Sequence, residues 1–494
     1  MRNSTTAARI ARMIDVRRAR RAAPSRIAGD GAGPGRPEKA VPKKGVLEKG
    51  VPGRGVPKKV VVVGGGFGGL GVLRYLEARL PAGSAELELI SPVDHLLYTS
   101  LLPQVAAGDV EPRHLAVSVR RTLSCSVLRL GHAVDVDPAG RTVCVVGRDG
   151  SRFAVGWDRL VLAPGSLTRI FDIPGLAEHA LGLKNLAEAV YLRDHVLRQL
   201  EYADACPSPA GRRARCTIVI VGAGYTGTEL AAQLRQFTLR AIDDFPRLAP
   251  ADLRMVLLDL APRVLPELGP ALSREAMRVL RARGVEIRPE TTVCRAAADS
   301  VTLTDGDVIP AHTLVWCAGV TPNPVVQTLG TETVRGRLVV DEYLRVPGLD
   351  GVFALGDAAA VPDVTRGGAP AGQTAQHAVR QGAAAGRNVA ASLGYGTARP
   401  YRHRDLGFVV DLGGADAAAN PLGITLTGRA AALVTRGYHL YALRSRTNRS
   451  RVVADWLLAA TAPEQVVQLG FMPPRAGTIA EREDVRLYAG ERPD

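Results

Sequence analysis

Two glycine-rich segments, each directly behind a run of β-branched residues, constrain the fold of this chain more than any other feature. The first, Val60–Gly69, reads VVVVGGGFGG, and the second, Ile218–Gly227, reads IVIVGAGYTG. Both contain the spacing G-x-G-x-x-G. Its first glycine permits a tight turn, its second lets backbone approach a pyrophosphate, and its third lets helix and strand pack closely. Because Gly222 follows Gly64 by 158 residues, the chain is predicted to contain two separate Rossmann-like units.

A single glycine-rich turn can also be purely structural, and that alternative applies to either segment alone. Here each turn follows an apolar strand and precedes a helical pattern, which is the context that dinucleotide binding requires. Two complete copies therefore favour two nucleotide sites, one for a bound flavin and one for a nicotinamide.

Composition sets the broad class of the protein. The 494 residues are 46% hydrophobic, which suffices for two or three domains with buried cores. No apolar run approaches the ~18 residues that cross a bilayer, and the N-terminus lacks the apolar core of a secretory signal. We therefore expect a cytoplasmic protein.

Most of the net charge of +15 lies in the first 59 residues, which hold 16 Lys/Arg and four Asp/Glu. The remainder is nearly neutral, so no nucleic acid is expected as a partner of the folded body. Residues 1–57 are rich in Arg, Pro and Gly and are predicted to be a disordered basic tail. The tail either binds acidic lipid or nucleic acid, or is a solvated extension translated from upstream of a start at Met13.

The six cysteines are scattered, with no C-x-x-C and no metal-ligand spacing. No metal site is therefore expected, and reduced thiols are the simplest interpretation. No cysteine lies between Gly69 and Cys125. Flavin enzymes that reduce a disulfide usually keep a close cysteine pair there, so a redox-disulfide mechanism is disfavoured.

The order of strand and helix patterns predicts an α/β fold with two Rossmann-like, three-layer ββα dinucleotide-binding domains. The FAD-binding domain is expected to be split into residues 58–185 and 325–397, with an NAD(H)-binding domain inserted at 186–324. A C-terminal α+β extension is expected at 398–494, as an interface or membrane-associating region.

In this order, the motifs resemble the pyridine nucleotide–disulfide oxidoreductases, which are flavoproteins with two dinucleotide-binding domains. Within that superfamily they are most similar to the type II NADH dehydrogenases. The resemblance covers about residues 58–460, and its most specific segments are Gly64–Leu70, Gly222–Leu230, Val315–Val320, Gly356–Asp357 and Ala375–Ala378.

For FAD, the resemblance implies a non-covalent cradle in which Asp357 bonds the ribityl–phosphate region. An Asp at this point can instead cap the following helix, but Gly356 before it removes a side chain that would block a ligand. Ser91 stands where most bacterial relatives have an acid for the ribose, and a hydroxyl makes fewer such bonds. The residues expected around FAD are Gly64, Gly65, Gly66, Phe67, Gly68, Gly69, Ser91, Ala163, Pro164, Gly165, Gly356, Asp357, Ala375 and Gln376.

For the nicotinamide, Asp259 at the end of an apolar strand is positioned to accept from a 2′-hydroxyl and would repel a 2′-phosphate. NADH is therefore favoured over NADPH, although Arg263 nearby weakens that preference. Glu229 matches a family glutamate near the nicotinamide and flavin, and the alternative is a solvated helix residue. The residues expected around NADH are Gly222, Gly224, Tyr225, Thr226, Gly227, Glu229, Asp259, Ala318 and Gly319.

The acceptor-side helix departs from the family pattern Ala-Gln-x-Ala-x-Gln, because this chain reads AQHAVR. Gln376 is kept, and Arg380 stands at the second glutamine position. Gln381 cannot replace that glutamine, since neighbours on a helix point ~100° apart. By resemblance, Glu229, Gln376 and Arg380 are the catalytic residues, and a cation at Arg380 favours an anionic reduced flavin or a polar acceptor. His377 is interpreted as a cap or surface residue rather than as an acid–base group.

The C-terminal region combines basic, aromatic and amphipathic character. Five arginines and one aspartate lie between Arg436 and Asp455, which suits a helix in a bilayer interface. The alternative is a helix packed on the body or on a second subunit in a homodimer. One apolar helix face is expected from Val452, Val453, Trp456, Leu457 and Ala460.

The resemblance implies an enzyme that transfers a hydride from NADH to FAD and then two electrons to a quinone, without pumping protons. It would lie in the cytoplasm, peripherally on the inner face of the cell membrane. One alternative is a soluble NAD(P)H-dependent flavoprotein reductase for a small quinone or a protein electron carrier. The other is a low-turnover redox-sensing flavoprotein, which would reduce its flavin once and stall.

Overall fold

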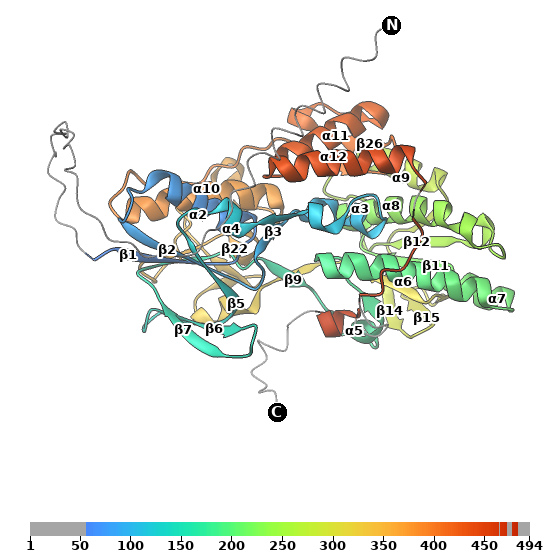
Figure 1. Ribbon diagram of the computed structural model, residues 1–494, viewed down its shortest axis with the longest axis horizontal. Coiled ribbons are helices and arrows are strands. Elements are labelled where there is room, and N and C mark those ends of the chain that lie inside the picture. The colour runs from blue at the N-terminus through green and yellow to red at the C-terminus, as the bar shows by residue number, and fades with distance from the viewer. Residues whose placement is uncertain (1–55, 464, 472–476, 483–494) are drawn as a thin grey trace, which may run out of the picture. The chain divides into compact units, whose positions relative to one another are not determined.

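The computed structural model of the protein describes residues 56–463, 465–471 and 477–482 (Figure 1). The predicted basic tail lies outside the described residues, apart from Val56 and Pro57. The described chain has the predicted α/β fold, in which two parallel sheets each carry one of the glycine loops.

The first sheet has the strand order β21-β8-β1-β2-β5-β6-β7. Its strands from β21 to β5 run parallel, and β6 and β7 extend it as an antiparallel arm. Because β21 comes from much later in the chain than its neighbour β8, two distant segments build this sheet. The strands are β1 (Lys58–Val63), β2 (Ala85–Ser91), β5 (Val127–Asp137), β6 (Thr142–Gly147), β7 (Arg152–Gly156), β8 (Arg159–Leu162) and β21 (Val352–Ala354).

The second sheet is wholly parallel, with the order β10-β17-β11-β12-β13. Its first strand lies just before the predicted domain boundary at residue 186. The strands are β10 (Ala180–Leu181), β11 (Thr217–Val221), β12 (Arg254–Leu258), β13 (Val285–Arg288) and β17 (Thr313–Trp316). Its helices are α6 (Leu186–Ala205), α7 (Pro209–Arg215), α8 (Tyr225–Ala241) and α9 (Pro270–Ala282).

The central strands are continuous apolar runs because both faces of each sheet are covered. Residues Val60–Val63 and Ile218–Val221 are all at most 4% exposed. Helix α2 (Phe67–Arg79) crosses α10 (Ala375–Ser392) at close range. A Cβ on Gly382 of α10 would lie 2.5 Å from the carbonyl oxygen of Gly68, so glycine is required at this crossing.

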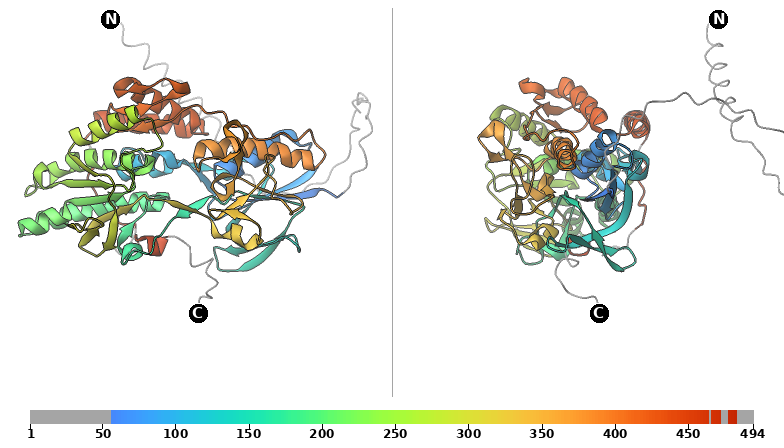
Figure 2. Two further views of the ribbon diagram at one scale, coloured as in Figure 1. Left: turned by 180° about the vertical axis from the view of Figure 1, so that it is seen from behind. Right: turned by 90° about the vertical axis from the view of Figure 1, so that its left-hand side faces the viewer.

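The predicted C-terminal α+β extension is present. A small antiparallel sheet of β25 (Val409–Asp411), β26 (Ala417–Ala419) and β27 (Leu426–Thr427) leads into α11 (Gly428–Ala442) and α12 (Arg446–Thr461). Figures 1 and 2 show α11 and α12 side by side, on the same side of the molecule as β26.

The predicted single apolar face of α12 is divided between the protein body and the surface. Val452 is fully buried, and the Trp456 indole donates to Gln104 of α3 (Leu102–Ala106) at 2.8 Å. Leu457 is 62% exposed. Position 456 therefore packs inward while 457 points away, because adjacent helix residues differ by ~100° in direction.

After α12, the chain crosses α6. The Arg193 guanidinium donates to the carbonyls of Gln465 and Val467, and the Asp194 carboxylate accepts from the amides of Leu469 and Gly470.

Among the described residues, no helix is both long and apolar enough to cross a membrane. The smaller strands and helices are β3 (His95–Leu97), β4 (Ala116–Ser118), α4 (Val119–Thr122), β9 (Ser166–Thr168), α5 (Leu176–His179), β14 (Val293–Ala296), β15 (Ser300–Leu303), β16 (Val308–Pro310), β18 (Val320–Pro322), β19 (Thr333–Val334), β20 (Arg337–Val339), β22 (Ala359–Ala360), β23 (Pro362–Asp363), β24 (Ala369–Pro370) and α13 (Ile479–Arg482).

Candidate active site

The first glycine loop joins β1 to α2. Each of the three glycines of its motif occupies a different geometric environment. Gly64 has φ +101°, and a Cβ there would lie 2.1 Å from the Ala163 carbonyl oxygen. A Cβ on Gly69 would lie 2.0 Å from the Gly64 carbonyl oxygen. Gly66 is exposed, and a Cβ there would meet no protein atom within 4 Å. The middle glycine thus faces open space at the N-terminus of a helix, where backbone N–H groups attract a phosphate.

The second glycine loop, between β11 and α8, repeats this geometry. Gly222 also has φ +101°, and a Cβ on Gly227 would lie 1.8 Å from the Gly222 carbonyl oxygen. A Cβ on Gly224 would again meet nothing within 4 Å. Tyr225 and the exposed Thr226 follow as the first residues of α8. The chain therefore forms two pyrophosphate-sized cradles at the carboxyl ends of two parallel strands.

Asp357 and the Ala163–Gly165 turn lie at the same edge of the first sheet, because β21 and β8 are neighbours. The Asp357 carboxylate accepts from the Ser166 hydroxyl at 2.6 Å, and the Lys184 ammonium donates to that hydroxyl at 3.0 Å. The Gly356 amide donates to the Gln381 side-chain oxygen at 2.7 Å. Sequence reasoning missed Lys184 and Gln381, whose partners are distant in sequence.

Ser91 lies against the first loop, but its hydroxyl is engaged locally. A Cβ on Gly65 would lie 2.8 Å from the Ser91 hydroxyl, which donates to the Val93 carbonyl at 2.8 Å. Ser91 is buried. A hydrogen bond donated by this hydroxyl to a ribose would therefore compete with the one that it donates to the Val93 carbonyl.

Gln376 and Arg380 lie together on α10, one turn apart. The Gln376 amide donates to the Gly407 carbonyl at 2.8 Å and accepts from the Leu406 amide at 3.4 Å. The Arg380 guanidinium donates to the Gln376 backbone carbonyl at 2.8 Å. The predicted pair thus borders the loop that enters the C-terminal sheet.

His377 takes part in the cap of α10, because its backbone amide donates to the Thr374 hydroxyl at 3.3 Å and its ring nitrogen lies 2.8 Å from that hydroxyl. Thr374 caps α10, and the His377 ring stacks on His403 with centroids 4.0 Å apart. Burial and the neighbouring His403 lower the pKa of His377 to about 4. The two rings fix the approach of the loop that carries His403 to the start of α10.

Glu229 is 8% exposed in the first turns of α8, so its alternative as a solvated helix residue is wrong. Its carboxylate accepts from the Asp411 amide at 2.9 Å. Burial raises the pKa of Glu229 well above its usual value, and the nearby Asp411 carboxyl adds to the effect. A carboxyl group with a raised pKa keeps its proton to higher pH than an exposed one, and in its protonated form it can donate a hydrogen bond.

Asp259 closes the second loop onto the end of β12. Its carboxylate accepts from the backbone amides of Ala223 and Ala261. Arg263 is turned toward its own loop, where one terminal nitrogen donates to the Pro266 and Leu268 carbonyls at 3.1 Å each. Ala318 and Gly319 follow β17 on the other side of the loop, with Gly319 at φ +78°.

The paired loops, Asp357 and the open space at Gly66 fit an FAD pyrophosphate and a second dinucleotide. The family model described as pyridine nucleotide-disulphide oxidoreductase matches residues 58–382. The chain belongs to this family.

Relatives of this oxidoreductase confirm the predicted resemblance to type II NADH dehydrogenases. It is 33% identical over 323 residues to the type II NADH:quinone oxidoreductase Ndh of Mycobacterium tuberculosis, covering 62% of this chain and 68% of that relative. It is 30% identical over 412 residues to the demethylphylloquinone reductase NdbB of Synechocystis, covering 81% and 95%. The solved NDH2 of Plasmodium falciparum with NADH has a TM-score of 0.77 at 16% identity, covering 83% and 99%, and so shares the fold.

All six cysteines of this oxidoreductase are free thiols. Cys317, beside the second glycine loop, is partly buried, and desolvation raises the pKa of its thiol to about 12. Thiolate chemistry at neutral pH is therefore disfavoured at this position.

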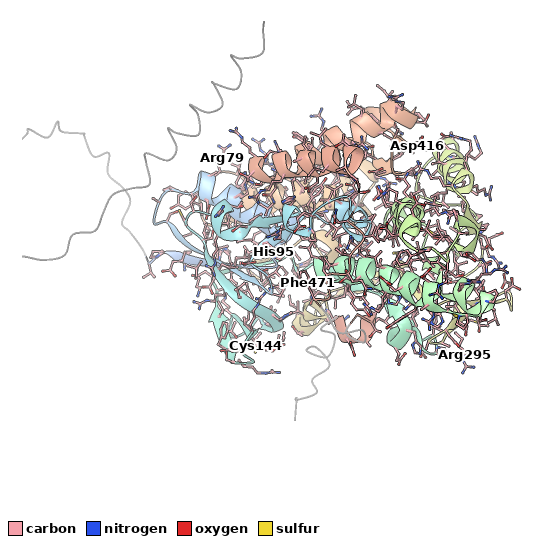
Figure 3. All side chains as sticks on the ribbon, turned by 45° about the vertical axis from the view of Figure 1, so that its right-hand side comes forward. Arg79, His95, Cys144, Arg295, Asp416 and Phe471 are labelled. Carbon is pink, nitrogen blue, oxygen red and sulfur yellow. The ribbon has the colours of Figure 1, made fainter. Side chains whose placement is uncertain are left out.

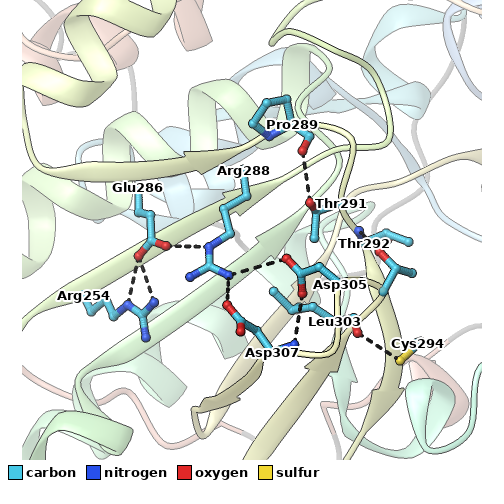
Figure 4. Close-up of polar contacts among 11 residues, drawn as sticks. Arg254, Glu286, Arg288, Pro289, Thr291, Thr292, Cys294, Leu303, Asp305 and Asp307 are labelled. Atoms are coloured by element: carbon cyan, nitrogen blue, oxygen red, sulfur yellow. Dashed lines mark hydrogen bonds and ion pairs between the residues drawn. The ribbon is translucent and has the colours of Figure 1, made fainter.

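A second cation near Asp259, the Arg288 guanidinium, contacts carboxylates through two of its nitrogens (Figure 4). Arg288 ends β13, and its backbone carbonyl accepts from the Asp259 amide at 3.2 Å. The Arg288 guanidinium bonds Glu286 and Asp307, each at 2.6 Å, and lies 3.8 Å from Asp305. These contacts hold its charge away from a ligand.

Proposed function

We propose that this protein is an FAD-dependent NADH:quinone oxidoreductase of type II, which does not pump protons. The observation that carries the proposal is the duplicated cradle, with Gly66 and Gly224 both facing open space in a chain of this family. Support also comes from relatives that are named as NADH:quinone oxidoreductases.

The domain roles follow from the two sheets. Residues 58–185 and 325–397 bind FAD, and the inserted residues 186–324 bind NADH. The first loop holds the FAD pyrophosphate at the N-terminus of α2, with Asp357 and the Ala163–Gly165 turn beside it. The second loop holds the NADH pyrophosphate at the N-terminus of α8.

When bound, FAD accepts a hydride from NADH and returns two electrons to the acceptor. The protein's contribution is alignment, because hydride transfer needs the reacting atoms ~3–3.5 Å apart. Two rigid parallel sheets provide that alignment, each presenting its loop from a strand end. Glu229, two residues beyond the second loop's last glycine, supplies a buried carboxyl group with a raised pKa close to the reacting rings.

Selection of NADH over NADPH rests on Asp259. Its carboxylate accepts from a 2′-hydroxyl and repels a 2′-phosphate. One terminal nitrogen of Arg263 donates to loop carbonyls, and Arg288 contacts three carboxylates, so both guanidinium groups are partly occupied by protein acceptors.

The acceptor site lies at the start of α10. Gln376, Arg380 and the Tyr438 hydroxyl are the side chains that we assign to the quinone carbonyls. Tyr438 belongs to α11, so the acceptor site borders the C-terminal helices.

These helices present apolar side chains outward and suit a peripheral site on the inner face of the cell membrane. The most exposed are Leu433 at 75%, Tyr441 at 74%, and Leu457 and Leu458 at 62% each. Arginines 444, 446 and 451 are exposed on the same two-helix segment. Apolar and basic side chains on one helical surface suit an anionic bilayer interface, and a homodimer is the competing occupant.

An anaerobic titration of the purified protein with NADH, followed by a panel of acceptors, tests the proposed function. One equivalent of NADH should bleach the bound flavin, and a soluble quinone should then restore its colour over many turnovers. Flavin that stays oxidised with excess NADH, or that is reduced once without turnover on any quinone, overturns the proposal.

A further inference from the structure

One face of α8 carries polar side chains from the glycine loop to the protein surface. Glu229, Gln233, Gln236 and Arg240 lie at i, i+4, i+7 and i+11, which is one helical stripe. Glu229 and Gln233 are buried at 8% and 2% exposure, while the Arg240 side chain is 39% exposed. Eleven residues of helix span about 16 Å. A buried helix face is normally apolar, so this stripe requires a reason.

A cavity of about 130 Å³ lies along the stripe. Gln233, Gln236 and Arg240 form one wall, and Gln104, Asp411 and Arg436 contribute from α3, β25 and α11. Because a cavity needs roughly 10–15 Å³ to hold one water molecule, this one has room for several waters. Amides and charged groups around it give those waters hydrogen-bond partners.

The two ends of the cavity differ in exposure. At the outer end, Arg240 pairs with Asp109 at 2.9 Å. At the inner end, Asp411 is 9% exposed, and its carboxylate accepts from the Gln104 amide at 2.6 Å. The Asp411 backbone amide donates to Glu229 at 2.9 Å. Asp411 thus separates the cavity from Glu229.

The reaction requires a proton from solvent. Its balance is NADH + H⁺ + quinone → NAD⁺ + quinol. The quinol gains two O–H hydrogens, and the transferred hydride supplies only one of them. A site that excludes water from the reduced flavin therefore needs an internal route for the second proton.

We propose that this cavity is that route, carrying a proton from bulk water at Arg240 past Gln233 and Gln236 to Asp411 and Glu229. The inference rests on the proposed quinone reductase activity. It gives Asp411 the role of a proton carrier, since this residue lines the cavity and its backbone amide contacts Glu229.

The charges around the two carboxyls agree with this role. Burial raises the pKa of Asp411, and that rise is partly offset by hydrogen bonds from the Gly413 amide and the Gln104 side chain and by the charges of Arg436 and Arg283. Around Glu229 lie Asp411 and the hydroxyls of Tyr98 and Tyr225, whose pKa values burial and Glu229 both raise. Both carboxyls therefore exchange protons at higher pH than exposed ones do.

The test compares a quinone with ferricyanide, whose reduction consumes no proton: NADH + 2 Fe(CN)₆³⁻ → NAD⁺ + H⁺ + 2 Fe(CN)₆⁴⁻. Asp411→Asn removes the carrier without changing its size, and Gln233→Leu makes the cavity wall apolar. Each variant should lower kcat with a soluble quinone by about tenfold or more, since positioned proton transfer contributes 10²–10⁴-fold. Ferricyanide reduction should stay within twofold, and the quinone defect should deepen as pH rises.

Two further variants separate proton transfer from packing. Asp411→Glu restores a carboxyl and should recover quinone turnover. Gln199→Leu changes a buried glutamine on α6, outside the cavity lining, and should leave the quinone-to-ferricyanide ratio unchanged. Unaltered quinone turnover in Asp411→Asn and Gln233→Leu, or equal losses with both acceptors, overturns the route. A wild-type protein that reduces ferricyanide but no quinone overturns the proposed function itself.

Discussion

The Glu229 carboxylate accepts a 2.9 Å hydrogen bond from the Asp411 amide, 182 residues further along the chain. This bond joins the first turns of α8 to the end of β25. The same hairpin is held by Arg283, which donates to the Leu412 carbonyl and pairs with Asp416 (Figure 3) at 2.7 Å. The C-terminal sheet is therefore attached to the unit of the second parallel sheet through α8 and the end of α9.

Gly66→Val should weaken flavin binding while the protein still folds. The new side chain meets no protein atom, and φ −75° is open to any residue, but it occupies the pyrophosphate space. Overpacking of ~1–3 kcal/mol corresponds to roughly 5- to 150-fold weaker binding. Flavin content and thermal unfolding of the purified variant measure both effects. Gly156→Ala, on β7 with only one ordinary contact, is the control, and a variant that retains full flavin contradicts the assigned loop.

Asp259→Ala should narrow the preference for NADH over NADPH by about tenfold, since a charged hydrogen bond contributes roughly 1.5–3 kcal/mol before compensation. The ratio of kcat/KM for the two nucleotides measures the change. Wild-type protein that uses both nucleotides equally well would show that Asp259 does not contact the ribose.

Arg380→Gln restores the family pattern and should raise turnover with hydrophobic quinones about fivefold, as expected if burying the charge costs ~1 kcal/mol. Flavin reduction by NADH should stay nearly unchanged. Rapid mixing resolves the two half-reactions, and Arg387→Gln, two turns further along α10, is the matched control. A slower NADH half-reaction with normal quinone reduction would reverse the placement of the two substrates.

Stability should fall as the pH drops from about 6.5 toward about 4, and His439 contributes to this fall. Burial lowers the pKa of His439 from 6.5 to about 4. Between pH 6.5 and about 4, His439 therefore binds a proton in the unfolded chain but not in the folded protein. This contribution is fully present above pH 6.5 and is lost at up to roughly 1.4 kcal/mol per pH unit. Unfolding midpoints between pH 7.5 and 4.5 should decline less in His439→Gln, whereas His179→Gln, at an exposed site, should match wild type.

Replacing Leu457 and Leu458 together by Glu should weaken binding to anionic vesicles roughly tenfold or more, since each buried leucine contributes about 1.5–3 kcal/mol. Vesicle co-sedimentation measures the loss. Val308→Glu, at an exposed apolar position on β16, should leave vesicle binding unchanged. If the leucine variant instead dissociates a dimer in sedimentation velocity without altering vesicle binding, this helix contacts a second subunit.

The glycine loops, the split of the first sheet and the order of the two nucleotide units could be predicted from the sequence, because each depends on local chemistry. Gly64 and Gly222 are required by the turns in which they lie, where φ is +101°. Asp411 could not be predicted, since a single acid at a strand end is typical of a turn or cap. Its partners Gln104 and Glu229 come from helices far away in the chain.

The C-terminal helices show a second limit of pattern reasoning. Hydrophobic periodicity placed Val452, Trp456 and Leu457 on one apolar face, but periodicity does not state what covers that face. In the folded protein, Gln104 and the body take up Trp456, while Leu457 remains at the surface. The stack of His377 on His403 was equally invisible, because tertiary packing alone brings these two rings together.

The insertion of one sheet between the strands of another has a consequence for how the chain is made. As the protein emerges from the ribosome, all five strands of the second sheet are synthesised by residue 316, and this unit can fold as a whole. Until β21 appears at residue 352, β8 is an unpaired edge and Asp357 does not yet exist. We therefore expect flavin to bind late in biosynthesis. The inserted unit is complete before the unit into which it is inserted.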